Sequence, residues 1–375
     1  MANPQYTARD AAASAPTAHG DNHFNLLRLM AAVAVLLSHG EFLYRLTMTV
    51  QFPNHTLGSL AVYCFFFISG CLVCQSWQRD SRWSVFWVKR IARIFPGLIV
   101  ATLFSVVVVG WAMTTLDTAG YWSHPGTWLN LFNNMAGMAT VQTLPGVFES
   151  NPFARAVNGS LWTIRYELLM YLLLSMAGLV GWTRHRWIYP LGAASMAAMW
   201  LWIHHTGTGG RPWLYEMFTI ADVTGFGVVF LLGSTFAAYR ARQSAWWALL
   251  AIGGAVLAWR AQTTWVVQVG VWICVAAGIF WLAHAGIQRW NGGWPREDLS
   301  YGVYIYAFPI QQAVTEIGLR RGWGLAFCLT LSLALTMGMA GLSWFFVEKP
   351  FIRYGQRLLR HIQRKPPYRS MTPAD

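Results

Sequence analysis

Two ionisable side chains, Arg28 and His39, share one apolar stretch near the start of the chain, in the run RLMAAVAVLLSH. In an α-helix their separation corresponds to about 1100°, some 20° beyond three full turns, and to about 16 Å along the axis. Both side chains are therefore expected on one helix face. A histidine can act as a general base toward a hydroxyl group, and an arginine can hold an anion. Two simpler interpretations stay open: Arg28 snorkels to lipid headgroups, or His39 is a neutral histidine hydrogen-bonded to a carbonyl group.

Glu167 is a third ionisable group within an apolar stretch, SLWTIRYELLMYL. A carboxylate in such a place needs a partner or a proton. The partners to consider are Arg165, which would lie on a different face of the same helix, and a histidine on another helix. An imidazole paired with a carboxylate suits general-base catalysis, because the carboxylate fixes the tautomer and stabilises the imidazolium. We therefore take His39 and Glu167, together with Arg28, as the candidate catalytic residues.

A basic cluster, QRDSRWSVFWVKRIARIFPG, lies between two apolar stretches. Arg90 and Arg93 face the same way if this segment is helical, with Lys89 beside them. Guanidinium groups bind phosphates in a bidentate manner, so the cluster fits a polyanionic coenzyme or anionic lipid headgroups. It could also serve only to orient the chain in a membrane. Just before it, FFFISG contains Ser69 and Gly70, whose small size allows close helix approach or leaves room for a slender ligand.

Membrane helices are the elements that must position these groups. Of the 375 residues, 55% are hydrophobic and only 11% are charged, whereas a soluble domain carries about 25% charged residues. This composition excludes an ordinary soluble enzyme. Ten apolar stretches are long enough to cross a hydrocarbon core of about 30 Å, and we predict an all-α polytopic membrane protein with about ten transmembrane helices. The stretches are 26–45, 58–77, 96–114, 161–181, 187–205, 219–238, 245–259, 265–285, 299–318 and 322–347.

The basic residues predict which side of the membrane each connection faces. If the N- and C-termini are both cytoplasmic, 19 Lys and Arg residues fall on the cytoplasmic side and seven on the other. This imbalance follows the positive-inside rule. The net charge of +13 then reflects connections that face anionic membrane lipids, and nucleic acid is excluded as a partner.

Three further expectations concern the ends of the chain, its longest connection and its cysteines. We expect residues 1–22 to be a disordered cytoplasmic arm, 23–353 the transmembrane domain and 354–375 a basic cytoplasmic tail. The long stretch 115–160 is a candidate lid or acceptor platform, or else a solvated linker. All five cysteines lie in apolar stretches, so we predict neither disulfides nor a metal site.

A series of motifs resembles those of a known family. In chain order they are HFNLLRLMAAVAVLLSH, FFFISGCL, FWVKRIARIFPGL, GSLWTIRYELLMY, FLLGSTFAAY, LSYGVYIYAFPI and FFVEKPF. Each string alone is weak, but their order and spacing over residues 23–353 are specific. The chain resembles the acyltransferase-3 family of integral-membrane O-acyltransferases, which modify bacterial surface and extracellular carbohydrates. Ala307 stands where this family often has a histidine, so no role is assigned to that position.

The resemblance implies a reaction and a set of residues. An acyl group, most often acetyl, would move from cytoplasmic acetyl-CoA to a hydroxyl group of an exported or lipid-linked carbohydrate, across a bacterial inner (cytoplasmic) membrane and without a metal. Acyl-CoA, the carbohydrate and membrane lipids are the implied partners. A fused esterase-like domain is not seen in the sequence, which favours exopolysaccharide repeat units as acceptors. The implied catalytic residues are His39, Glu167 and Arg28, and the implied donor-binding residues are Arg90, Arg93, Lys89 and Ser69.

Two other classes of function remain. A proton-coupled transporter or flippase of a polysaccharide pathway could use Arg28, His39 and Glu167 as a proton relay, although we find no internal repeat of the kind common in transporters. A scaffold in a polysaccharide export complex is the third class, but it would not need an arginine and a histidine aligned within one span.

Overall fold

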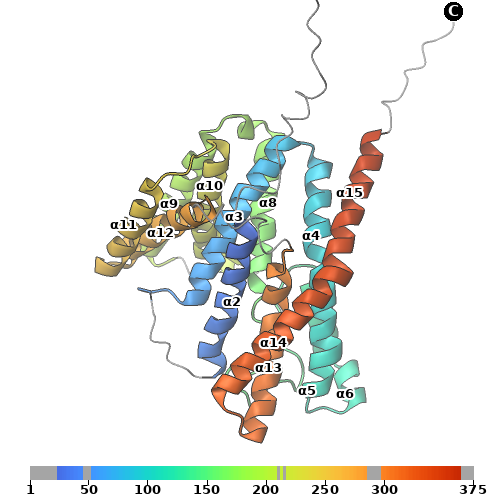
Figure 1. The fold of residues 1–375 in the computed structure, drawn as a ribbon. Helices are drawn as coiled ribbons and strands as arrows, with labels where there is room; N and C mark the ends of the chain where they lie inside the picture. Colours follow the sequence, from blue (N-terminus) through green and yellow to red (C-terminus); the bar gives the residue numbers. More distant parts are fainter. Residues whose placement is uncertain (1–22, 45–51, 209–211, 214–216, 285–296, 365–375) are drawn as a thin grey trace, which may run out of the picture.

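The computed structural model describes residues 23–44, 52–208, 212–213, 217–284 and 297–364, and these residues are mostly helical (Figure 1). The helical fold class is therefore confirmed. The arm predicted over residues 1–22 lies outside the described residues. Each of the ten predicted stretches overlaps one long helix. These are α2 (Phe24–Leu43), α3 (Leu57–Arg79), α4 (Trp83–Leu103), α8 (Trp162–Leu179), α9 (Ile188–Thr206), α10 (Ile220–Ala238), α11 (Trp246–Arg260), α12 (Thr264–His284), α13 (Ser300–Arg321) and α14 (Leu325–Ser343).

Six of the helices in the described part of the chain are long and apolar enough to cross a membrane. They cover Phe24–Glu41, Leu57–Arg79, Trp83–Met113, Ile220–Ala238, Thr264–His284 and Leu325–His361. The protein is thus a multi-pass membrane protein. α11 is shorter than these six, and α8, α9 and α13 are not among them, so the full number of ten spans stays a prediction.

Two helices are longer than the sequence analysis predicted. α4 begins at Trp83, and it continues through a π-helical turn, η1 (Phe104–Gly110), into α5 (Trp111–Met113). Most of the basic cluster therefore lies in the first part of a helix, and Pro96 lies inside this helix. α14 likewise continues through η4 (Trp344–Glu348) into α15 (Lys349–Arg364), so the first part of the predicted basic tail is helical. Lys and Arg are good helix formers, and their charge hides such helix ends from a search for apolar stretches.

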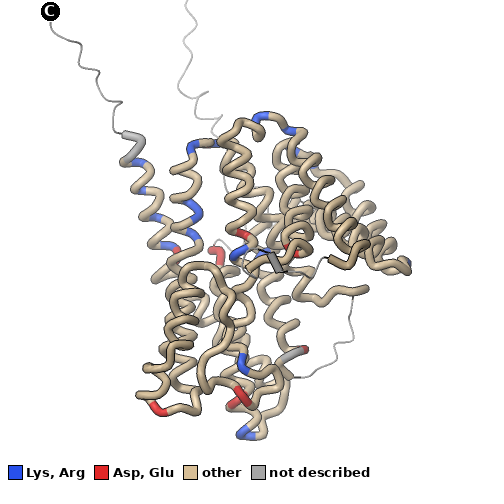
Figure 2. The backbone as a smooth tube through the Cα atoms, turned by 180° about the vertical axis from the view of Figure 1, so that it is seen from behind, with Lys and Arg blue, Asp and Glu red and all other residues tan. Residues whose placement is uncertain are grey.

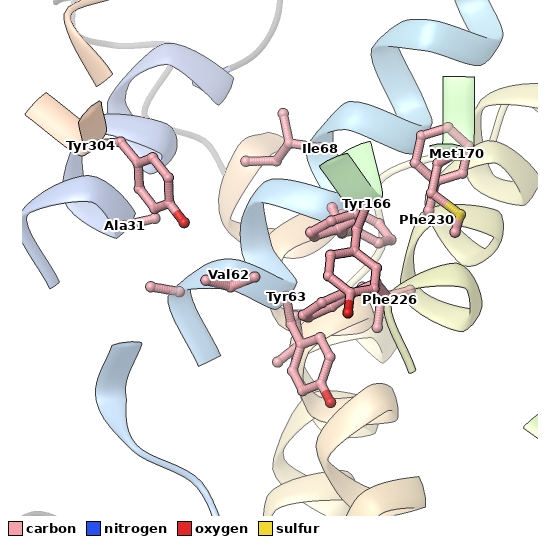
Figure 3. Close-up of a cluster of buried hydrophobic side chains, with 14 of the residues drawn as sticks. Ala31, Val62, Tyr63, Ile68, Tyr166, Met170, Phe226, Phe230 and Tyr304 are labelled. Carbon is pink, nitrogen blue, oxygen red and sulfur yellow. The ribbon is translucent and has the colours of Figure 1, made fainter. Parts of the chain in front are cut away.

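Glycines allow α3 and α10 to pack closely. A Cβ atom at Gly70 would lie 1.9 Å from the carbonyl oxygen of Phe230, and one at Gly233 would lie 2.1 Å from that of Phe67. The two backbones are therefore in direct contact, which is one of the two roles that the small residues of FFFISG allowed, while Ser69 lines a cavity. Around this contact lies a core rich in aromatic rings from α3, α8 and α10 (Figure 3). The rings of Phe66 and Phe226 stack there with centroids 4.4 Å apart.

The long stretch between α4 and α8 is folded and is not a solvated linker. It contains α6 (Thr118–Ser123) and α7 (Pro125–Met135) and has a small core of its own, which includes Tyr121, Leu144 and Phe148. Buried amides attach it to α13. Asn151 Nδ2 donates to Gln312 Oε1 (2.8 Å), and Gln312 Nε2 donates to the carbonyl oxygens of Phe153 (2.8 Å) and Ala156 (2.7 Å). We refer to residues 114–161 as the cap.

Short polar elements complete the fold. β1 (Pro212–Trp213) and β2 (Phe218–Thr219) form a small antiparallel hairpin before α10. Thr219 then caps α10, because its hydroxyl oxygen accepts from the backbone N–H of Asp222. All five cysteines are free, which confirms that they form no disulfide.

Basic residues gather at one end of the bundle and along α15, while a smaller group of acidic and basic residues lies at mid-height inside it (Figure 2). The interior group contains the candidate site.

Candidate active site

A cavity inside the bundle brings together most of the residues that the sequence singled out. Its walls come from α2, α3, α4, α8 and α13. The predicted residues Arg28, Ser69, Arg90, Arg93 and Glu167 all line it. Tyr171, Thr163, Tyr301 and Tyr304 add hydroxyl groups, and the remaining lining is apolar. A narrow apolar cavity with a few convergent polar groups is the usual form of a ligand site.

Glu167 is hydrogen-bonded to two hydroxyl groups. Ser69 Oγ donates to Glu167 Oε1 at 3.1 Å, and the hydroxyl of Tyr171, one turn further along α8, donates to the same oxygen. Ser69 Oγ and the Tyr171 hydroxyl are also 3.0 Å apart. The predicted partner, a histidine, is not there: among the described residues no hydrogen bond joins Glu167 to His39. The pairing of Glu167 with His39 therefore stays a prediction, and the hydroxyl partners of the Glu167 carboxylate come from α3 and α8.

Arg90 lies against this group. Its guanidinium carbon is 5.6 Å from the centre of the Tyr171 ring and 5.7 Å from that of Phe86. Its buried Nε has no hydrogen-bond partner among the described residues. A cation held over aromatic rings with an unused donor can accept an anionic ligand. Lys89, in contrast, is not among the residues that line the cavity.

Arg28 and Arg93 are held by an acid that the sequence analysis did not select. Asp298, just before α13, accepts on one oxygen, Oδ2, from Arg28 Nη1 (2.6 Å) and from Arg93 Nη2 (2.5 Å). Its other oxygen accepts from the hydroxyl (2.5 Å) and the N–H (3.2 Å) of Ser300. Glu348 is fully buried and lies 3.7 Å from Arg93 Nη1. Asp298 thus connects α2, α4 and the start of α13.

The surroundings of Asp298 keep it ionised. Burial alone would raise the pKa of this carboxyl group, but the guanidinium groups of Arg28 and Arg93 and the hydrogen bonds from Ser300 outweigh it and lower the pKa to about 2. Asp298 and Glu348 stand at the ends of apolar stretches, and a search for charges inside spans passes over them. The signal that points to them is the requirement that buried arginines have acidic partners.

His39 lies outside this cavity, further along α2. Its ring meets Phe308 of α13 edge to face, with centroids 4.9 Å apart, and the side chain of Gln311 is next to it. The buried Nδ1 of His39 and the buried Oε1 of Gln311 both lack a hydrogen-bond partner among the described residues. Buried polar atoms are rarely left unpaired, so both atoms can still take a further polar partner.

On α13, one helical turn separates a residue that lines the cavity from a residue that contacts His39. Tyr304 lines the cavity, and Phe308, four residues later, touches His39. The Tyr304 hydroxyl is 2.6 Å from Thr163 Oγ1, and its ring packs against Phe65 at 5.6 Å. Arg28 and His39 do share the continuous helix α2, as predicted, and Arg28 lines the cavity whereas His39 does not.

Comparisons with known proteins agree with the motif order. Residues 21–344 match the profile of the acyltransferase-3 family, described as "Acyltransferase domain". The chain is 28% identical over 356 residues to a protein of Shigella phage Sf6 named "O-acetyl transferase", covering 89% of this chain and 97% of the other. It is 29% identical over 360 residues to "Nodulation protein 10" of Rhizobium leguminosarum bv. viciae, covering 88% and 93%. No solved structure matches the chain.

Proposed function

The chain belongs to the acyltransferase-3 family, and we propose that this membrane O-acyltransferase moves an acetyl group from cytoplasmic acetyl-CoA to a hydroxyl group of an exported or lipid-linked carbohydrate. The name of the phage relative supports acetyl as the group and oxygen as the acceptor atom. The bacterial and phage sources of the relatives support a bacterial inner membrane. The observation that carries the proposal is the cavity in which three arginines and a glutamate from three helices meet.

The donor is assigned to the cavity on grounds of charge. Arg28 and Arg93 share the Asp298 carboxylate, whereas Arg90 makes no ion pair among the described residues. Arg90 is therefore the first candidate to contact a phosphate of the coenzyme. Arg93 lines the same cavity from α4 and is the second candidate. Lys89 precedes Arg90 on α4 and is assigned to the mouth of the site. The apolar lining between these groups and Tyr304 suits the slender, uncharged arm that carries the thioester.

The acceptor is assigned to His39, because its unpaired Nδ1 suits a hydroxyl group. In the proposed step the imidazole takes the hydroxyl proton, and the acceptor oxygen attacks the thioester carbonyl carbon. The new C–O bond forms, the C–S bond breaks, and the proton passes to the sulfur, which leaves as free CoA.

A covalent route uses the same atoms in two steps. The imidazole nitrogen first attacks the thioester carbonyl carbon, so that an N–C bond forms, the C–S bond breaks and CoA leaves as a thiolate. The acceptor oxygen then attacks the acyl carbon, the N–C bond breaks, and the hydroxyl proton passes to the thiolate, which leaves as free CoA. Glu167 does not touch His39, so in either route we assign it to the donor side, where it holds Ser69 and Tyr171 in place beside Arg90.

Purified protein in lipid vesicles tests the proposal. Acetyl-CoA labelled in its acetyl group is supplied with a bacterial glycan extract, and both glycan-bound label and free CoA thiol are measured. The transferase proposal predicts that label enters the glycan and that thiol release depends on the extract. Glycan movement across the vesicle membrane with no transfer of label would instead support the transporter alternative and contradict the proposal.

A further inference from the structure

Helix α7 has the reverse of the pattern found in a helix that faces water. Its apolar side chains Trp128, Leu129 and Phe132 are 42%, 58% and 62% exposed. Its polar side chains Asn130 and Asn134 are only 3% and 4% exposed. A surface helix in water buries the apolar face and exposes the polar one, so the outward face of α7 does not suit an aqueous surface.

The buried polar side chains of α7 make hydrogen bonds inside the cap. Asn130 Nδ2 donates to the carbonyl oxygens of Val141 (3.1 Å) and Thr143 (2.9 Å). Asn134 Nδ2 donates to Asn130 Oδ1 (3.0 Å) and to the same Val141 carbonyl (2.9 Å). These bonds fix which way α7 is rotated. The apolar side chains cannot turn inward without breaking them, so their exposure is built into the fold.

The exposed face of α7 continues the outer surface of a membrane-spanning helix. α7 packs against α4 and η1. On that span Val107, Val108 and Trp111 are exposed. Aromatic rings join the two surfaces: the Trp111 and Trp122 centroids are 6.5 Å apart, those of Trp122 and Trp128 are 5.9 Å apart, and those of Trp128 and Phe132 are 6.1 Å apart.

The lack of charged residues in this part of the cap also fits a surface that faces lipid. Between Asp117 and Glu149 the chain contains no Asp, Glu, Lys or Arg residue. A water-facing segment of this length normally carries several charges, whereas charged groups are costly in lipid and Trp is enriched at the membrane interface.

We propose that the outward face of α7 lies in the lipid bilayer, in the leaflet in which the α4–η1–α5 span ends. The partner is lipid, not a second protein, because the face is continuous with the lipid-facing surface of that span. The cap is then anchored to the membrane by Trp128, Leu129 and Phe132, and is not a lid that opens into water. This inference depends neither on the orientation of the protein nor on the chemistry proposed above.

Spin labels on the full-length chain test the inference. The five native cysteines are replaced by alanine, and a nitroxide is attached to Trp128→Cys, Leu129→Cys or Phe132→Cys in three separate variants. The matched control is Glu149→Cys, an exposed charged position of the same cap. The protein is placed in vesicles of phosphatidylcholine and phosphatidylglycerol, and collision rates with oxygen and with a water-soluble nickel chelate are measured.

The proposal predicts frequent collisions with oxygen and few with nickel at the three α7 positions, and the opposite at Glu149→Cys. Nickel collisions at the α7 positions as frequent as at the control would show that the face contacts water and would overturn the proposal. Protection from both reagents would overturn it too, since the face would then be covered by protein. Three independent positions keep the test valid if one variant fails to fold.

Discussion

His39 and Glu167, which the sequence analysis considered as one catalytic pair, have different surroundings in the structure. His39 lies against Phe308 and Gln311 with an unpaired Nδ1, whereas Glu167 is engaged by Ser69 and Tyr171. A base that takes a proton from an acceptor needs a free nitrogen, and a group that shapes the donor site needs fixed partners. The two residues therefore affect different parameters of the reaction when they are changed.

Replacing His39 by alanine is expected to lower transfer of labelled acetyl groups by about 100-fold to 10,000-fold, the usual contribution of a general base. Binding of acetyl-CoA, measured by equilibrium dialysis on the same preparation, should change little because His39 is outside the cavity. His205→Ala at the exposed end of α9 is the matched control and should leave both quantities unchanged. Transfer at the normal rate by His39→Ala would remove His39 from the mechanism.

Asp298→Asn is expected to lower the free energy of unfolding by about 3 kcal/mol, because it leaves the largely buried Arg28 without its acid and Arg93 with Glu348 alone. The pKa of Asp298 is lowered to about 2 from its usual 3.8. The stabilisation is therefore fully present above about pH 4 and is lost as the pH falls toward 2.

Thermal unfolding in detergent between pH 7 and pH 3 measures this effect. The gap in Tm between wild type and Asp298→Asn should be constant down to about pH 5 and should narrow below pH 4. Asp80→Asn is the control, since Asp80 pairs with Arg82 at the surface (2.7 Å), where an ion pair contributes less than about 1 kcal/mol. A gap that widens as the pH falls would contradict the assigned role of Asp298.

The residues that could be predicted are those whose type conflicts with their surroundings. Arg28, Arg90, Arg93 and Glu167 are charged groups in or beside apolar stretches, and all four line one cavity. Asp298 could not be selected in this way, because its importance lies in partners on α2 and α4 that are far away in sequence. The separation of His39 from Glu167 was likewise beyond prediction, since it depends on how α2, α8 and α13 pack.

At the scale of elements, apolar length predicted helices well and predicted their ends poorly. All ten stretches are helical, but α4 starts well before 96 and α15 extends the last helix far beyond 347. In both places basic residues occupy helical turns. For the stretch 115–160 the sequence left a lid or platform and a solvated linker open, because the polar side chains of the cap point inward and its pattern resembles neither a soluble helix nor a span.

The contact between α3 and α10 gives a prediction for a pair of helices. Gly70→Ala places a methyl group 1.9 Å from the carbonyl oxygen of Phe230, so the helices must move apart, at a cost of about 1 to 3 kcal/mol. Gly341→Ala on α14 is the matched control, because nothing lies within 4 Å of its added Cβ atom and alanine favours helix by up to about 1 kcal/mol.

The two glycine variants are therefore expected to shift the Tm in opposite directions, downward for Gly70→Ala and upward or not at all for Gly341→Ala. Thermal unfolding followed by tryptophan fluorescence in one detergent measures both. An unchanged Tm for Gly70→Ala would mean that the close approach of α3 and α10 does not limit stability.

At the scale of the whole molecule, the described helices place the start of α2 and the end of α15 on the same side of the bundle (Figure 1). Basic residues are concentrated toward that side and along α15 (Figure 2). Both features are what an even number of membrane crossings with cytoplasmic ends would produce. Under the proposed function, the cavity that is assigned to the donor would be reached from the side that carries these charges, where acetyl-CoA is made.

This orientation predicts opposite labelling of two exposed arms of the chain. Single cysteines are introduced as Glu149→Cys in the cap and Arg184→Cys between α8 and α9, both at exposed positions, in the variant whose five native cysteines are alanine. A membrane-impermeant maleimide should modify Glu149→Cys in cells whose outer membrane alone has been opened. It should modify Arg184→Cys only after the inner membrane is also disrupted. The reverse pattern would place the arginine cavity toward the outside, and a cytoplasmic acyl-CoA could not then be the donor.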